Sequence, residues 1–214
     1  LFAPRSPIVP AAPNGPTFIN LTPGITSALT TSPLGYNSQP ALNADGTRVA
    51  YWSTTDISNS SHLRNLDGSV ELFAASINPA SGEVTYTQIT SSTGSILGGF
   101  NFGPSVDDAG NLIAFFSDRD LTAGGNPDRN FEIFLAQIDA AYQVTLTQLT
   151  HTTDGINVFP SISADGRRIA FTSDRDLTGG NADLNPEIYL VDLAANGQPL
   201  GYTQVTATAA EVFN

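Results

Sequence analysis

Residues 160–173 read Pro-Ser-Ile-Ser-Ala-Asp-Gly-Arg-Arg-Ile-Ala-Phe-Thr-Ser, and related stretches begin at Pro40 and Pro104. Each stretch is followed by a Glu-Leu/Ile-Phe/Tyr block and then by a Gln-x-Thr block, in the same order. The first block occupies residues 71–73, 132–134 and 187–189, and the second occupies 88–90, 148–150 and 204–206. Shared blocks in one order predict three copies of a single structural repeat.

Each repeat contains four short segments of the strand type, as the third copy shows most clearly. Apolar and β-branched residues at 161–163 and 168–172 flank Ala-Asp-Gly, which is a typical hairpin turn. Two further strands are expected at 187–192 and 202–206, joined by a turn at 195–198. No long segment has an uninterrupted helical period. Four antiparallel strands in a repeat are typical of a β-propeller blade, so the predicted fold is all-β.

The third repeat, residues 160–176 followed by 187–192, resembles the TolB-like (Trp-Asp-repeat-like) β-propeller family. The family repeat contains Pro-Ser-x-Ser-x-Asp-Gly, an Ile-Ala-Phe strand, Ser-Asp-Arg, and an acidic residue before Ile-Tyr. The resemblance covers nearly the whole chain and implies a propeller of four-stranded blades. It also implies an extracytoplasmic protein, secreted, periplasmic or on the cell surface. It implies little about activity, because propellers have many functions.

The repeats predict one partial propeller of about three and a half blades over residues 1–214. We expect a half blade with a Pro-rich loop at 1–35, full blades at 36–95, 96–152 and 153–206, and the start of another blade at 207–214. A ring normally has at least about four blades, and an arc leaves strand edges that invite association. We therefore expect further sequence or a protein partner to complete the ring. The lack of Met indicates a piece of a longer precursor.

The composition excludes several classes of function. The chain has 8 basic residues, all Arg, against 20 acidic residues, and its formal net charge is −12. This acidic balance argues against binding to nucleic acid or to anionic membrane surfaces. Without Cys there is no disulfide, thiolate metal site or Cys nucleophile. The longest apolar runs are only a few residues long, so no membrane span is expected.

A polar loop of the form Asn-x-Asp-x-Asn/Ser-x-Glu separates the second and third predicted strands of every blade. Oxygen ligands at alternate positions suit calcium, which takes about six to eight oxygens. The second and third blades are the better candidates, because the first has no counterpart to Asp118. The candidate calcium ligands are Asp118, Asp120, Asn126, Asp128, Asn130 and Glu132, and Asp174, Asp176, Asn181, Asp183, Asn185 and Glu187.

The same loops also have a purely structural interpretation, which the sequence leaves open. Asn, Asp and Ser are common turn residues that hydrogen-bond to nearby backbone. The Ser-Asp-Arg segments at 117–119 and 173–175 could tie the second strand to the next blade through an Arg–carboxylate pair.

Catalytic residues are not predicted within this chain. The two histidines, His62 and His151, lie in different blades, and His151 is interpreted as an exposed loop residue. Neither a Gly-x-Ser-x-Gly elbow nor a His-Glu-x-x-His motif occurs. The first functional hypothesis is a non-enzymatic, extracytoplasmic, protein-binding or structural scaffold, with calcium as a stabilising ion. The alternative is the propeller portion of a larger enzyme, such as a prolyl-oligopeptidase-like peptidase, whose catalytic residues lie outside this chain.

Overall fold

The computed structural model describes residues 35–57, 65–93 and 99–209, which form twelve strands and no helix. The strands make three four-stranded antiparallel sheets, each with its strands in chain order. Blade one contains β1 (Asn37–Leu42), β2 (Arg48–Ser53), β3 (Glu71–Ile77) and β4 (Val84–Gln88). Blade two contains β5 (Asn101–Val106), β6 (Leu112–Ser117), β7 (Glu132–Ile138) and β8 (Val144–Gln148). Blade three contains β9 (Asn157–Ile162), β10 (Arg168–Ser173), β11 (Glu187–Leu193) and β12 (Pro199–Gln204).

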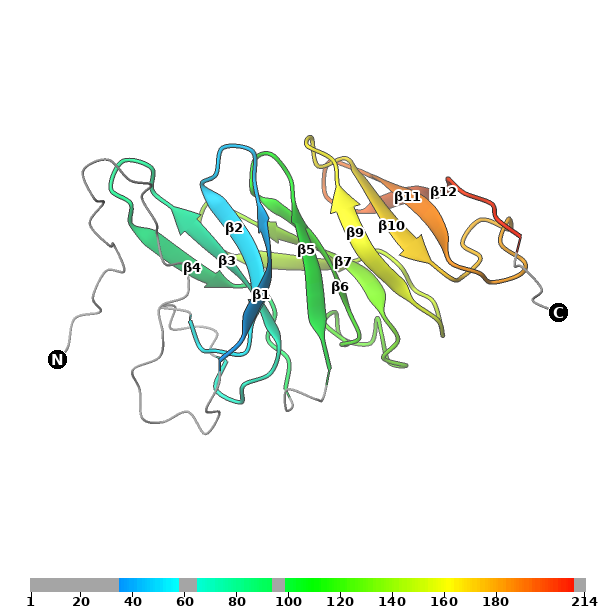
Figure 1. The fold of residues 1–214 in the computed structure, drawn as a ribbon, viewed down its shortest axis with the longest axis horizontal. Helices are drawn as coiled ribbons and strands as arrows, with labels where there is room; N and C mark the ends of the chain where they lie inside the picture. The colour runs from blue at the N-terminus through cyan, green and yellow to red at the C-terminus, as the bar shows by residue number, and fades with distance from the viewer. Residues whose placement is uncertain (1–34, 58–64, 94–98, 210–214) are drawn as a thin grey trace.

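The all-β fold with four-stranded antiparallel blades is confirmed. Apart from Gly35, the predicted half blade at 1–35 lies outside the described residues, as do residues 210–214 of the predicted next blade. The sheets within the described residues do not close into a ring (Figure 1).

Asp-Gly turns join the first two strands of blades one and three, as predicted for blade three, and Ala109-Gly110 forms the equivalent turn in blade two. Gly46, Gly110 and Gly166 have φ values of 74°, 73° and 69°, a left-handed conformation that glycine adopts without steric cost. In blade three the Gly166 N–H donates to the Ser163 carbonyl at 2.9 Å and closes the turn. The turn residue type therefore fixes the register of the first hairpin.

A β-bulge interrupts the first strand of every blade, just before the Pro of the repeat. Gln39, Gly103 and Phe159 have φ values of 52°, 60° and 57°, and the pairing register shifts around each of them. Gln39 Oε1 accepts a hydrogen bond from the Gly103 N–H at 2.8 Å, which links the bulges of blades one and two. Bulges of this kind bend a strand and increase its twist.

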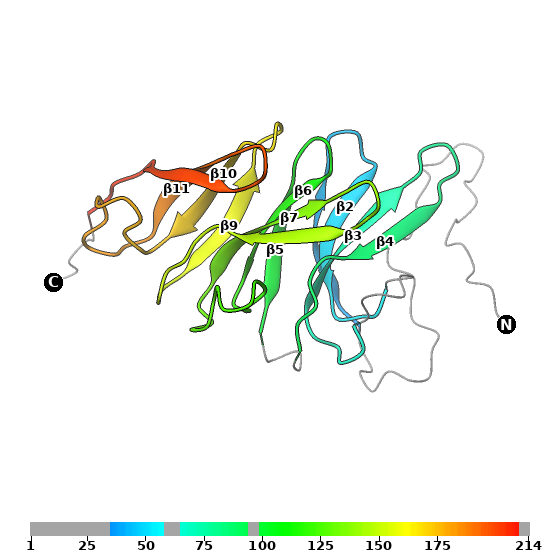
Figure 2. The same cartoon turned by 180° about the vertical axis from the view of Figure 1, so that it is seen from behind.

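The blades lie in a row with their faces packed together, from blade one to blade three (Figure 1). The first strands are neighbours: β5 lies against β1 and β2, and β9 lies against β5 and β6. Figure 2 shows the same row from behind, with β4 and β11 in the sheets at its two ends. Buried side chains from facing sheets form one apolar core between blades one and two and another between blades two and three. Burial of these apolar faces is the main force that holds the row together.

Candidate functional site

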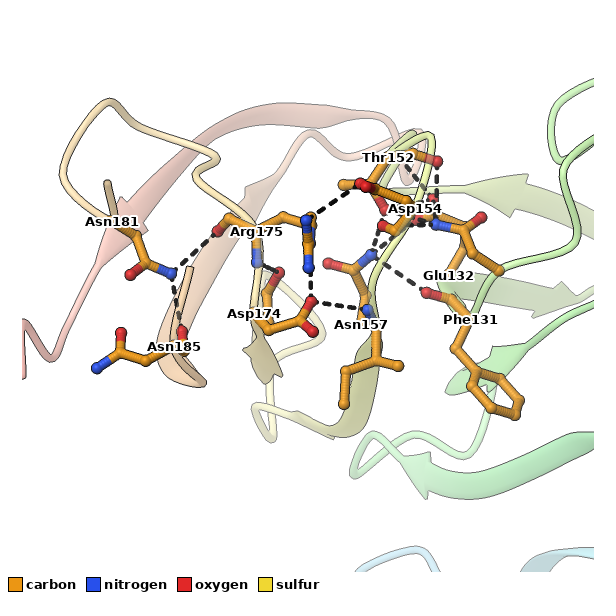
Figure 3. A network of polar contacts seen from close by, with 12 residues as sticks. Phe131, Glu132, Thr152, Asp154, Asn157, Asp174, Arg175, Asn181 and Asn185 are labelled. Atoms are coloured by element: carbon orange, nitrogen blue, oxygen red, sulfur yellow. Dashed lines mark hydrogen bonds and ion pairs between the residues drawn. The ribbon is translucent and has the colours of Figure 1, made fainter. Parts of the chain in front are cut away.

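The glutamate that begins the third strand of each blade lies at the centre of a polar network. Glu71, Glu132 and Glu187 are at most 2% exposed. In blade two, Glu132 Oε1 accepts hydrogen bonds from the Thr152 N–H at 2.6 Å, the Thr152 hydroxyl at 2.7 Å and the Asn130 side-chain amide at 3.0 Å (Figure 3). Its carboxylate thus joins the polar loop to the segment that leaves the blade.

Blade one repeats this arrangement with different donors. Glu71 Oε1 accepts hydrogen bonds from the Ser92 N–H and hydroxyl, both at 2.6 Å, and from the Ser69 hydroxyl at 2.8 Å. The Thr90 hydroxyl donates to the other carboxylate oxygen. Charge-assisted hydrogen bonds are stronger than neutral ones, and several of them on one carboxylate offset much of the cost of its burial.

An asparagine from the next blade completes the networks of Glu71 and Glu132. Asn101 Nδ2 lies 3.3 Å from Glu71 Oε2, and Asn157 Nδ2 lies 3.1 Å from Glu132 Oε2. Asn157 also donates to the Phe131 carbonyl at 3.2 Å, which places it across the seam between blades two and three (Figure 3). The Glu–Asn contact is therefore a polar junction between consecutive blades.

Sequence analysis missed these asparagines, although the chain carries a signal for them. An Asn stands three residues before the repeat proline in every blade, as Asn37, Asn101 and Asn157. The strand pattern alone gives no reason for an amide at this position. The contact that this amide makes is seen only in the folded structure, where the preceding blade lies beside it.

At blade three the described residues supply only the contacts that Glu187 receives from its own blade. Glu187 accepts hydrogen bonds from the Thr208 N–H at 2.5 Å, the Thr208 hydroxyl at 2.6 Å and the Thr206 hydroxyl, all from its own blade. Among residues 35–57, 65–93 and 99–209, no asparagine of a following sheet donates to it. Within the described part of the chain, blade three therefore carries the glutamate side of a junction without the asparagine side.

The pKa values of the three glutamates shift in different directions, depending on whether a following blade covers the carboxylate. Burial raises the pKa of Glu71 and Glu132 above the ordinary 4.5, despite the hydrogen bonds that oppose it. Hydrogen bonds from Thr206 and Thr208 hold the pKa of Glu187 below 4.5, and no other sheet of the described residues packs on this end. Glu71 and Glu132 therefore lose stabilising effect as pH rises from 4.5 through their folded pKa values. Glu187 contributes stability above 4.5 that is lost as pH falls through its folded pKa.

We expect a carboxyl carbon-13 NMR titration to give this order directly. Glu71 and Glu132 should titrate above 4.5, and Glu187 should titrate below it. Resonances are assigned with Glu71→Gln, Glu132→Gln and Glu187→Gln variants. Three equal midpoints would contradict the difference in coverage between the junctions.

The predicted calcium ligands are also parts of turns. Asn126 Nδ2 donates to the Asn130 carbonyl at 2.9 Å, and Asn181 Nδ2 donates to the Asn185 carbonyl at 2.9 Å, so each first Asn closes its own loop. Asp120 accepts backbone N–H bonds from residues 124–126. These hydrogen bonds, that from residue 124 foremost, hold its pKa below the usual value.

The remaining aspartates of the predicted set divide into three groups. Asp176 repeats the turn of Asp120, accepting the Gly179 N–H at 2.7 Å. Asp118 and Asp174 accept N–H bonds at 2.6 Å and 2.8 Å from the segments that lead into β5 and β9. Asp128 and Asp183 are exposed on the loop surface.

These positions bear on which of the predicted ligands fit a calcium ion, and calcium binding itself stays a prediction. Within the described part of the chain, no three His, Cys, Asp or Glu side chains converge as a metal site. However, among the predicted ligands in the described part of the chain, the buried amide oxygens of Asn126, Asn130, Asn181 and Asn185 have no hydrogen-bond donor. In blade one the corresponding Asn65 oxygen accepts from the Ser69 hydroxyl at 3.2 Å. The four asparagine oxygens are therefore the atoms of the predicted set that best fit a hard cation.

The Ser-Asp-Arg segment forms an ion pair, but not with the next blade as predicted. Arg175 lies 3.2 Å from Asp154 and 3.0 Å from Asp174 (Figure 3). Asp154 belongs to the connection that enters blade three from blade two, so the pair joins the second strand to the preceding blade. The cause is geometric, because this end of the second strand lies beside the incoming connection.

The remaining predictions concern catalysis and membranes. His151 is exposed in the loop after β8, as predicted, and His62 lies outside the described residues. None of the elements described is a helix that could cross a bilayer.

The chain is similar to several solved propellers. No family model and no curated protein matches it. A protein of Agrobacterium tumefaciens described as a TolB is 18% identical, with 83% of this chain and 51% of that chain covered and a TM-score of 0.46. The β-propeller domain of the Trilobed protease from Pyrococcus furiosus is 12% identical, with 82% and 44% covered and a TM-score of 0.45. Each repeat forms one four-stranded antiparallel sheet, which is the arrangement of a propeller blade. The chain spans about half the length of these two structures.

Proposed function

We propose that this chain is a non-enzymatic, extracytoplasmic β-propeller module that acts as a protein-binding scaffold. The docking surface is the free face of blade three, defined by Ile188, Leu190 and Val205. The partner is a further set of propeller blades or another protein with a comparable sheet. The observation that carries this proposal is the exposure of apolar positions that are buried at both internal junctions.

Equivalent positions in the three blades differ sharply in exposure. Ile188 is 38% exposed, whereas its counterparts Leu72 and Ile133 are each 0% exposed. Val205 is 54% exposed, and the matching residues of blades one and two are buried at 2% and 0%. Exposed apolar surface framed by polar residues is a common mark of an interaction site. A sheet is the occupant that this surface fits, since sheets cover the same positions in blades one and two.

The polar residues of the free face indicate which hydrogen-bonding group the partner should supply. Among the described residues, Glu187 accepts hydrogen bonds from its own blade, whereas Glu71 and Glu132 also receive an amide from the next one. A partner strand with an asparagine or another N–H donor at this place would complete the junction. Register between the two sheets would follow from this contact, because a buried polar group requires its partner.

Substitution of Ile188 tests the proposal in the organism that makes the protein. We expect Ile188→Arg to release the chain from its native assembly, because burial of an unpaired charge is costly. Light scattering after size-exclusion chromatography measures the mass, and circular dichroism checks that the fold is retained. Asn196→Arg, on the exposed β11–β12 turn, is the matched control. If the Ile188→Arg variant keeps the mass of the native assembly, the proposed surface is wrong.

The peptidase alternative is distinguished by activity. If the chain is the propeller portion of a larger enzyme, the native assembly hydrolyses peptides, and the catalytic residues map to polypeptide outside residues 1–214. A scaffold gives an assembly without that activity.

Calcium binding is a separate part of the proposal and rests on the four asparagine oxygens named above. We expect the Tm to be about 2–4 °C higher in millimolar calcium than in chelator. Magnesium is the control ion, since it is reluctant to exchange its waters for protein ligands. An Asn126→Ala, Asn181→Ala double variant should lose the calcium response, and Asn65→Ala should retain it. An equal Tm in calcium and in chelator would contradict calcium binding.

A further inference from the structure

A pocket of about 450 Å³ lies between blades one and two, away from the free face of blade three. One wall comes from the segment after β4 and from the β6–β7 loop, and it carries Ser92, Thr93, Arg119 and Arg129. The opposite wall is apolar and includes Val144 and Leu146 of β8. The pocket thus combines cationic and hydroxyl groups with branched apolar side chains.

Arg119 is the unusual group in this pocket. Arg119 is only 6% exposed, yet its Nε and Nη2 atoms have no hydrogen-bond acceptor. Nη1 donates to the Thr93 carbonyl at 3.1 Å, and the carboxylate of Asp118 is 3.9 Å from Nε. Buried donors without acceptors are rare and costly, so their presence indicates a missing partner.

The repeat itself shows what that partner is. Arg175 occupies the same place in blade three and pairs with two carboxylates, Asp154 through Nη1 and Asp174 through Nε. Asp154 stands four residues after Thr150, and the chain has Gly94 at the matching place after Thr90. At Arg119 the sequence has no carboxylate at this place, and Nη1 donates to the Thr93 carbonyl instead, so Nε and Nη2 are the atoms left without an acceptor.

The backbone around Arg119 is shaped to accommodate its guanidinium. A Cβ on Gly99, which has a φ of 145°, would lie 1.9 Å from Arg119 Nε. A Cβ on Gly155 would lie 2.0 Å from Arg175 Nε. In both blades, therefore, a glycine makes room for the guanidinium.

We propose that this pocket binds a carboxylate carried by a short branched apolar group, held by Arg119 and Arg129. Guanidinium groups bind carboxylates through paired hydrogen bonds, and Val144 and Leu146 accommodate the apolar part. Asp120 also lines the pocket, but its carboxylate accepts N–H bonds from residues 124–126. Because the chain has a net charge of −12, recognition depends on these short-range contacts rather than on long-range attraction.

The ligand could be a free branched-chain acid or the C-terminal carboxylate of a peptide, and calorimetry distinguishes them. The probes are sodium 3-methylbutanoate, N-acetyl-Gly-Leu, and the neutral amide of each. We expect both acids to bind with a Kd on the order of 1 mM or tighter, and the amides to bind at least about tenfold more weakly. Tighter binding of the dipeptide than of the small acid identifies the peptide source, and the reverse identifies the free acid. Equal binding of acid and amide, or no binding of either acid, overturns the proposal.

Three arginine variants assign the site. We expect Arg119→Gln to weaken acid binding about tenfold or more, since it removes a charge-assisted contact. Arg175→Gln is the matched control, because it removes the equivalent ion pair in blade three but leaves the pocket intact. Arg129→Gln alters an exposed residue, so it tests the site even if Arg119→Gln does not fold, and we expect about threefold weaker binding. Wild-type affinity in Arg129→Gln together with wild-type affinity or misfolding in Arg119→Gln contradicts the assignment.

Discussion

Replacing Glu132 by Ala is expected to lower the free energy of unfolding by about 3 kcal/mol or more. The carboxylate is fully buried and accepts hydrogen bonds from Thr152, Asn130 and Asn157. Its removal takes the acceptor from the Thr152 N–H and hydroxyl, weakens the contacts of Asn130 and Asn157, and opens a gap at the seam between blades two and three. Urea denaturation followed by circular dichroism measures the loss.

A double-mutant cycle separates the junction from simple loss of packing. Glu132→Ala and Asn157→Ala should be coupled by about 1–2 kcal/mol, because the two side chains share a hydrogen bond across the seam. Glu132→Ala and Asn101→Ala should be additive within about 0.5 kcal/mol, because Asn101 contacts Glu71 instead. Additivity in the first pair would show that the contact does not join the blades.

The second large effect concerns one position of the repeat in two blades. Ile133→Ala is expected to lower the free energy of unfolding by about 2–5 kcal/mol, because blade three packs on this side chain and a cavity would remain. Ile188→Ala should cost less than about 1 kcal/mol, since that side chain is 38% exposed. Both losses are measured by the same urea titration.

This pair of variants is internally controlled, since both remove the same atoms from the same strand position. Similar losses at Ile133 and Ile188 would mean that blade three is covered in the isolated chain. The free face would then not be available to a partner.

The blades are largely predictable from sequence because their signals are local. Asp165-Gly166 predicts a turn since glycine suits a left-handed φ, and the apolar run at 168–172 predicts the strand that follows. The local sequence is sufficient for both inferences, because each depends on neighbours only a few residues away.

The junctions are less predictable because their partners lie far apart in the sequence. Glu132 meets Asn157 only after blade three has packed on blade two, and a pattern within one loop cannot show this contact. The same acidic and amide side chains suit a calcium loop, so residue type alone left two interpretations open. Arg119 and Arg175 show the same limit, since both follow Ser-Asp, but Arg175 has close contacts with two carboxylates whereas Nε and Nη2 of Arg119 have no hydrogen-bond acceptor.

Thiol labelling tests the free face most directly, because the chain contains no Cys and accepts a single reporter. The reporters are Ile188→Cys, the buried Ile133→Cys, and Asn196→Cys on an exposed turn. In the purified chain, Ile188→Cys should react with maleimide nearly as fast as Asn196→Cys, and Ile133→Cys should react far more slowly. In the native assembly, the reaction at position 188 should slow to the rate at position 133, while that at position 196 stays fast. An unchanged rate at position 188 in the assembly would contradict the claim that a partner sheet covers blade three.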